Sequence, residues 1–126
     1  MTTMVCFEAA GEDYCLPVQV TRAVRTAETV IALPDPVPDV VGVIAGDPPL
    51  TVISALQSKG MQILVVDTGE KTFGLLVDKV TGLLRVDDDL IRPAPPGQQS
   101  PLISGTLDAE GHPVLVADPI ALAGRL

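Results

Sequence analysis

Few side chains in this chain have a chemistry that could support catalysis. The sequence holds one His, two Cys and one Tyr, whereas catalysis needs a nucleophile, a base or a metal set in one place. His112 lies in the stretch Glu110-Gly111-His112-Pro113, which favours a solvated turn histidine over a ligand or a base. One His and two distant Cys do not match the spacing of a tetrahedral metal site. The sequence therefore predicts a protein with no enzymatic activity, no metal and no cofactor.

Cys6 and Cys15 flank the turn residues Ala10 and Gly11. In an antiparallel hairpin centred on that turn, the two thiols fall opposite each other on neighbouring strands. A free Cys behaves as a small buried hydrophobe, and disulfides are rare in reducing compartments. We expect core packing, with redox sensing through a disulfide as the alternative.

Three further polar features have a structural and a functional interpretation. The run Asp87-Asp88-Asp89 lacks the alternating ligands and the final bidentate Glu of a calcium loop, so a solvated charge run is favoured. Asp78 could be a catalytic carboxylate, but it follows an apolar strand and is better explained as a structural residue at a strand end. The segment Asp35-Pro36-Val37-Pro38 has the composition of a polyproline ligand, and a rigid connection between strands is the favoured explanation.

Composition limits the class of protein. A length of 126 residues suits a single domain covering 1–126. The formal charge of −8, without a cluster of Lys and Arg, disfavours nucleic acid and anionic membranes as partners. No apolar run is long enough to cross a bilayer and the start of the chain has no secretory leader pattern, so we expect no membrane insertion and a cytoplasmic location.

The elements that must position these residues are short strands. Aromatic residues make up only 2% of the chain, while 12 Pro and 11 Gly punctuate aliphatic, β-branched runs. Asp118-Pro119 predicts a helix N-cap with proline in the first turn, opening a short helix that runs to about Ala123. Regular turns without βαβ alternation predict an all-β barrel or sandwich. The expected strands are 4–9, 14–18, 21–26, 40–45, 50–55, 61–67, 72–78, 80–86, 102–107 and 114–117.

The order of several short motifs resembles the CheW-like domain of bacterial chemotaxis coupling proteins and of the chemotaxis histidine kinase. The most specific parts are Gly74-Leu75-Leu76-Val77-Asp78-Lys79-Val80 and the later Ile91-Arg92-Pro93-Ala94-Pro95. The resemblance spans nearly the whole chain. It also rests on Phe7, Tyr14-Cys15-Leu16-Pro17-Val18, Leu33-Pro34, Gly42-Val43-Ile44, Ile103-Ser104-Gly105 and Asp118.

The resemblance implies a fold and a set of partners. The fold is all-β, with two intertwined five-stranded SH3-like β-barrel subdomains, a short C-terminal helix and a hydrophobic groove between the subdomains. One subdomain would bind the regulatory domain of a CheA-type histidine kinase. The groove would accept the cytoplasmic tip of a chemoreceptor (methyl-accepting chemotaxis protein), since an aliphatic groove suits a helical hairpin.

The sequence departs from the family where partner contacts are expected. After Gly42, typical members carry an Asn-Leu-Arg-Gly segment whose Arg is implicated in receptor binding, whereas this chain has Ala45, Gly46 and Asp47 followed by two prolines. The typical Glu of the third strand falls on Ala23. The joint loss of the Arg and the Glu has a physical reason. If only one of them were lost, the other would be an unpaired charge in a partly buried groove, which is energetically costly. A different partner and neutral drift both remain open explanations.

Other groove positions that follow from the resemblance are Gln62 and Leu83, and Gly74 keeps the family residue. The main hypothesis is a non-enzymatic chemotaxis adaptor that couples chemoreceptors to a CheA-type kinase through protein contacts. The alternative is a divergent CheW-like protein that binds only one of these partners, or a different one, and insulates or redirects a chemosensory pathway. A small enzyme or a ligand-binding barrel is the least favoured class.

Overall fold

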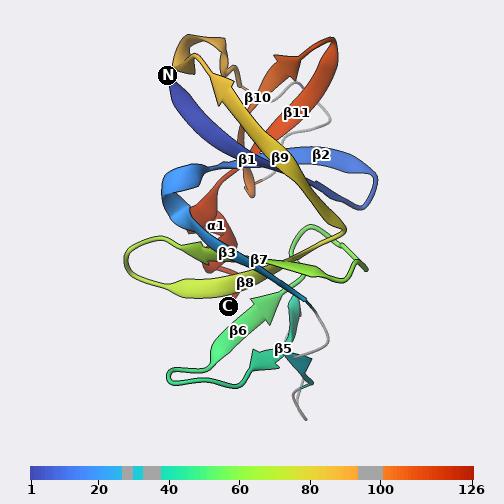
Figure 1. Ribbon diagram of the computed structural model, residues 1–126, viewed down its shortest axis with the longest axis vertical. Helices are drawn as coiled ribbons and strands as arrows, with labels where there is room; N and C mark the ends of the chain where they lie inside the picture. Colours follow the sequence, from blue (N-terminus) through green and yellow to red (C-terminus); the bar gives the residue numbers. More distant parts are fainter. Residues whose placement is uncertain (27–29, 33–37, 94–100) are drawn as a thin grey trace.

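The computed structural model describes residues 1–26, 30–32, 38–93 and 101–126. Within these ranges the protein is built from two β-sheets, three short helical segments and their connections (Figure 1). Among the described residues, no helix is long and apolar enough to span a membrane.

The first sheet combines the two ends of the chain with one strand from its middle. Its five strands follow the order β10-β11-β2-β1-β9, and they occupy the upper half of Figure 1. The pair β11 and β2 is parallel, while the other neighbours are antiparallel. The bounds are Thr2–Ala9 for β1, Glu12–Pro17 for β2, Lys79–Val86 for β9, Ile103–Ala109 for β10 and His112–Ala117 for β11.

The second sheet is made from the central part of the chain. It has six strands in the order β3-β7-β8-β6-β5-β4, with β6 and β8 parallel. The sixth strand, β4, has only two residues and was not predicted. The bounds are Thr21–Thr26 for β3, Val30–Ile31 for β4, Val40–Ile44 for β5, Leu50–Ile53 for β6, Gln62–Asp67 for β7 and Thr72–Val77 for β8.

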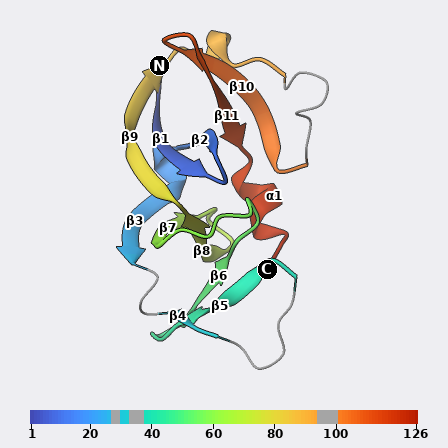
Figure 2. The same ribbon diagram turned by 90° about the vertical axis from the view of Figure 1, so that its right-hand side faces the viewer.

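Short helical segments connect and end the strands. Two 3-10 helices cover Val18–Val20 and Asp88–Leu90, and the helix α1 covers Pro119–Ala123. As predicted, Asp118 caps α1, because its Oδ1 accepts hydrogen bonds from the backbone N–H groups of Ile120 and Ala121 at 3.0 and 3.3 Å. Figure 2 shows α1 between the upper and lower halves of the molecule.

The core joins the two sheets. Its largest cluster of buried residues contains Phe7 and Leu16 from the first sheet, Phe73 and Leu75 from the second, and Leu122 from α1. Each sheet also has a smaller cluster of its own, around Met4 and Cys15 in the first and around Val52 and Ile63 in the second. The aliphatic core expected from the composition is therefore continuous across both halves.

The predicted all-β fold of two subdomains is confirmed, and several details differ. The second predicted strand ends one residue early, because Val18 begins a 3-10 helix. The strand expected to reach Ala55 ends at Ile53, and Leu102 precedes β10. His112 is the first residue of β11 and does not lie in the turn. The motif Leu33-Pro34, the residues Asp35 to Val37 of the expected connection, and Ala94 and Pro95 lie outside the described residues.

Candidate functional site

A shallow groove runs along the junction of the two sheets, between β3 on one side and β1 and β9 on the other. Its volume is about 370 Å³ and its lining is mostly apolar. We call it the junction groove. The residues that line it are Val5, Val18, Thr21, Arg22, Ala23, Val24, Leu64, Val80, Gly82 and Leu83.

Leu83 is the most exposed large apolar residue of the junction groove, with 69% of its surface accessible. It lies opposite Val5 on β1, and Val5 is buried in the core. The β1–β9 ladder shifts register between Cys6 and Phe7, which places Gly82 and Val80 opposite them. Gly82 has φ +151°, a backbone conformation that glycine adopts without the usual steric cost. This bulge, together with the twist that bulges add, helps to set the direction of Leu83.

The opposite wall is β3, which lies at the edge of the second sheet. Ala23 and Val24 are exposed there, Val24 by 49%. Arg22 is held in place, because its Nε lies 3.4 Å from the Asp67 carboxylate and its Nη1 donates to the carbonyl oxygen of Gln19 at 3.1 Å. Two predicted positions, Ala23 and Leu83, therefore meet in one groove.

Sequence reasoning did not identify Val18, Arg22 or Val24 as residues of this groove. The run Thr21-Arg22-Ala23-Val24-Arg25-Thr26 has little apolar alternation, which is the signal of a strand without a well-buried face. All six residues are exposed or half-buried. That pattern could have identified β3 as an exposed strand, but its neighbours in space could not be read from it.

Gln62 supports the junction groove from the side. Its Oε1 accepts a hydrogen bond from the backbone N–H of Val80 at 2.7 Å, which holds the start of β7 beside the start of β9. Gly74 lies inside the second sheet and is buried. A Cβ at this position would lie 2.7 Å from Cγ2 of Ile63 and 3.2 Å from Cγ2 of Val52, so glycine is needed here for packing.

The remaining predicted positions lie elsewhere. Gly42 is on β5, where a Cβ would overlap the carbonyl oxygen of Ile31 on β4. Ala45, Gly46 and Asp47 are exposed in the connection between β5 and β6, at the lower end of the molecule in Figure 1. Of the predicted positions, Ala23 and Leu83 therefore line the junction groove and Gln62 lies beside it. Gly74 is buried inside the second sheet, and the other four lie in the β5–β6 hairpin.

The polar residues that could have suggested catalysis have structural contacts. Asp78 Oδ1 accepts a hydrogen bond from the Ser58 hydroxyl at 2.6 Å, and Oδ2 accepts one from the backbone N–H of Ala10 at 3.0 Å. Asp87 caps the second 3-10 helix by accepting from the N–H of Asp89 at 3.2 Å. In the part of the chain that the structure describes, no group of three His, Cys, Asp or Glu is placed to hold a metal ion.

The two thiols are free. Burial, followed by the negative charge of Asp13, raises the pKa of Cys6 above its ordinary value. Burial, followed by the neighbouring Cys6, raises the pKa of Cys15 to about 12. Both groups are therefore protonated thiols near neutral pH, which disfavours nucleophilic chemistry.

Comparisons with known proteins agree with this architecture. A search of curated proteins found no match. Among solved structures, the chain is similar to the scaffolding protein TtCheW from Thermoanaerobacter tengcongensis. The TM-score is 0.81 at 21% sequence identity, over 93% of this chain and 84% of that one, and this likeness supports the two-subdomain fold. The sequence model of the CheW-like domain matches residues 49–126. The chain therefore belongs to the CheW-like domain family.

Proposed function

We propose that this protein is a chemosensory adaptor that links the cytoplasmic tip of a chemoreceptor to the regulatory domain of a CheA-type histidine kinase. It acts in the cytoplasm through protein contacts alone, without catalysis or a cofactor. Membership of the CheW-like family and a fold similar to that of a scaffolding protein support this role.

The junction groove is the observation that carries the proposal. Leu83 on β9, Val24 on β3 and Val18 on the first 3-10 helix expose 69, 49 and 39% of their surfaces, and all three line a single apolar depression. Exposed apolar residues gathered in this way are typical of binding surfaces. A receptor helix could bind in such a groove through apolar side chains that are three or four residues apart and therefore lie on one face of the helix.

In a second candidate function, the fold is the same but the protein does not bind both partners. In it, the protein binds only one of the two partners, or a different one, and redirects a chemosensory pathway. The absence of a cationic residue from Ala45 to Pro49 favours this candidate, since the family Arg is missing there. The two functions differ in whether receptor and kinase bind at the same time.

Binding measurements distinguish these functions. We would titrate the protein with the regulatory domain of the chemotaxis kinase from the same genome, then with a receptor-tip fragment, by isothermal calorimetry. Independent binding to both supports the coupler, and binding to one supports the second candidate. If neither binds to a folded sample, both candidate functions with these partners are wrong.

A matched pair of variants tests the junction groove. Leu83→Arg places a charge in the apolar groove and should weaken receptor binding at least about tenfold, because the partner would have to bury an unpaired charge. Ile120→Arg is the control, since Ile120 is 75% exposed on α1 and does not line the groove. Receptor binding that survives Leu83→Arg in a folded protein would show that the receptor binds elsewhere.

A further inference from the structure

The function proposed above uses neither of the two free cysteines, although both lie in the β1–β2 hairpin. Cys6 on β1 is directly opposite Cys15 on β2. Directly opposite residues of an antiparallel pair project from the same face of the sheet, and both cysteines belong to the apolar cluster around Met4, Val114 and Val116. Cys6 also contributes to the raised pKa of Cys15, as expected for two neighbouring groups.

The register gives this pair the geometry that a disulfide needs. The turn Ala10-Gly11 makes Ala9 and Glu12 the hydrogen-bonded pair that closes the hairpin. Because the two kinds of pair alternate along the ladder, Cys6 and Cys15 are a non-hydrogen-bonded pair, whose Cα atoms are typically about 4.5 Å apart. Disulfides span Cα separations of about 4.4–6.8 Å. The hairpin can therefore form this bond with little movement of its backbone.

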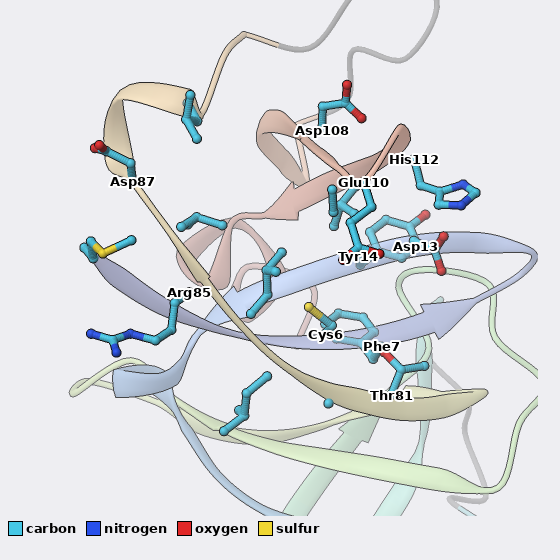
Figure 3. Close-up of a pocket in the computed structure, with 18 residues that line it drawn as sticks. Cys6, Phe7, Asp13, Tyr14, Thr81, Arg85, Asp87, Asp108, Glu110 and His112 are labelled. Carbon is cyan, nitrogen blue, oxygen red and sulfur yellow. The ribbon is translucent and has the colours of Figure 1, made fainter.

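Cys6 is the accessible member of the pair. It is half-buried, whereas Cys15 has no accessible surface. Cys6 lines a cavity of about 550 Å³ between β9 and the β10–β11 hairpin, and Figure 3 shows it on β1 among the other lining residues. Gly82 lies opposite Cys6 on β9, and a Cβ at Gly82 would have no neighbour within 4 Å. The residue opposite this thiol therefore has no side chain to cover it, and a small oxidant that enters the cavity reaches Cys6 before Cys15.

We propose that Cys6 and Cys15 are a redox modification site, at which a low-molecular-weight disulfide such as oxidised glutathione converts the two thiols to a reversible cross-strand disulfide. In the first step the Cys6 thiolate attacks one sulfur of the small disulfide, whose S–S bond breaks, and the other sulfur leaves as a thiolate that takes up a proton. In the second step the Cys15 thiolate attacks the Cys6 sulfur and releases the second small thiol. Overall, the pair loses two protons and two electrons, and the small disulfide is reduced to two thiols.

The raised pKa of each thiol makes this exchange slow but does not prevent the disulfide from forming at equilibrium. The thiolate is the attacking form in both steps, and little of it is present at neutral pH. The second step is intramolecular and joins groups that the sheet holds opposite each other, which favours the cross-strand disulfide over a mixed disulfide at Cys6. In a reducing compartment the pair stays as two packed thiols, so the disulfide marks oxidising conditions.

The equilibrium between thiols and disulfide tests the proposal. The full chain is brought to equilibrium with graded ratios of reduced to oxidised glutathione, quenched with acid and digested without reduction by a glutamyl endopeptidase. This enzyme cleaves after Glu8 and Glu12, between the two cysteines, so mass spectrometry detects a linked pair of peptides. We expect that pair to form and to be reversed by dithiothreitol. Its equilibrium constant should be at least about tenfold larger for the folded protein than for the protein in concentrated urea, because a disulfide that fits the native structure is favoured by folding.

A shifted pair is the matched control. The double variant Cys15→Ala, Asp13→Cys still has two cysteines in the same hairpin and on the same face of the sheet, but they lie on a diagonal of the ladder. The Cα atoms of diagonal neighbours are about 7–8 Å apart, beyond the limit of about 7 Å for a disulfide without backbone movement. The equilibrium constant of this variant should be at least about tenfold smaller than that of the native pair, and its NMR spectrum reports whether it is folded.

Three results would overturn the proposal. The first is the absence of the linked peptides when the folded chain is at equilibrium with the most oxidising buffer. The second is an equilibrium constant no larger for the folded protein than in urea, which would mean that the fold does not favour the bond. The third is a folded shifted variant that is oxidised as readily as the native pair. None of these results depends on receptor or kinase binding.

Discussion

Cys6 on β1 and Cys15 on β2 lie directly opposite each other in the first hairpin. The turn between the strands consists of Ala10 and Gly11, both with positive φ, so Ala9 and Glu12 form the closing hydrogen-bonded pair. Counting back from that pair makes Cys6 and Cys15 a non-hydrogen-bonded pair, in which side chains approach most closely. The pairing expected from the sequence is thus confirmed, and the thiols remain free.

The two thiols should differ in reactivity. Cys15 is fully buried, whereas Cys6 is half-buried and lines the cavity between β9 and the β10–β11 hairpin. Because the thiolate is the reactive form, iodoacetamide at pH 8 should modify Cys6 slowly and Cys15 at least about tenfold more slowly. Mass spectrometry of the digested protein measures both rates. Faster labelling of Cys15 would contradict the packing of β2 described here.

The same burial predicts a pH dependence. The folded-state pKa of Cys15 is raised from 9.0 to about 12, so its contribution to stability is complete below pH 9 and is lost as the pH rises from 9 towards 12. The stability advantage of the native protein over Cys15→Ala should therefore fall over that range, by at most about 1.4 kcal/mol per pH unit. Urea unfolding of both proteins at several pH values tests this, and a constant difference would contradict it.

Asp67 should titrate below its ordinary pKa of 3.8, chiefly because its Oδ1 accepts a hydrogen bond from the backbone N–H of Gly69 at 2.8 Å. The hydrogen bond from Arg22 and its positive charge each lower the pKa by less than the Gly69 hydrogen bond does. Arg22→Gln should therefore raise the pKa of Asp67 only part of the way back to 3.8. NMR of the side-chain carboxyl measures this pKa. Stability that depends on this lowered pKa is present above pH 3.8 and is lost as the pH falls through the folded-state value. A complete return to 3.8 in Arg22→Gln would assign the effect to the ion pair.

Asp78 should be structurally important. Asp78→Ala removes the acceptor for the Ser58 hydroxyl and for the N–H of Ala10, and hydrogen bonds to charged groups contribute about 1.5–3 kcal/mol each. We expect a loss of roughly 2–4 kcal/mol in the free energy of unfolding, measured with urea. Glu70→Ala, at an exposed turn position, is the control and should change stability by less than about 0.5 kcal/mol. Equal effects would mean that Asp78 does not connect these segments.

The β5–β6 hairpin provides a test of the second predicted surface. Asp47→Lys reverses a charge at an exposed position and should weaken binding of one protein partner about tenfold if this hairpin contacts it. Glu70→Lys reverses a charge in the exposed β7–β8 turn and serves as the control. Calorimetry with kinase and receptor fragments measures both. Unchanged binding of both partners would remove Ala45, Gly46 and Asp47 from the partner surface.

The elements that local signals specify were predictable from the sequence. Thr21–Thr26 was predicted with its observed bounds, and Asp118-Pro119 identified the start of α1. Both depend on residue type and spacing over a few positions. The two-residue strand β4 was missed, because Val30 and Ile31 are too few to show alternation.

The three-dimensional arrangement of the elements was harder to predict from the sequence. The parallel pairing of β6 with β8 and of β11 with β2 joins segments that no local pattern links. The exposure of Leu83 follows from the bulge in the β1–β9 ladder and from the position of β3. The resemblance to a family suggested Ala23 and Leu83, but only the fold shows that they share one groove.

A single residue, Asp78, connects β8 of the second sheet to β9 of the first. The largest buried cluster contains side chains from both sheets. These two facts leave no place for a hinge between the halves in the described part of the chain. Two proteins bound to opposite halves would be held at one fixed separation and angle. In an assembly, such a domain acts as a rigid spacer that transmits the movement of one neighbour to the other without absorbing it by bending.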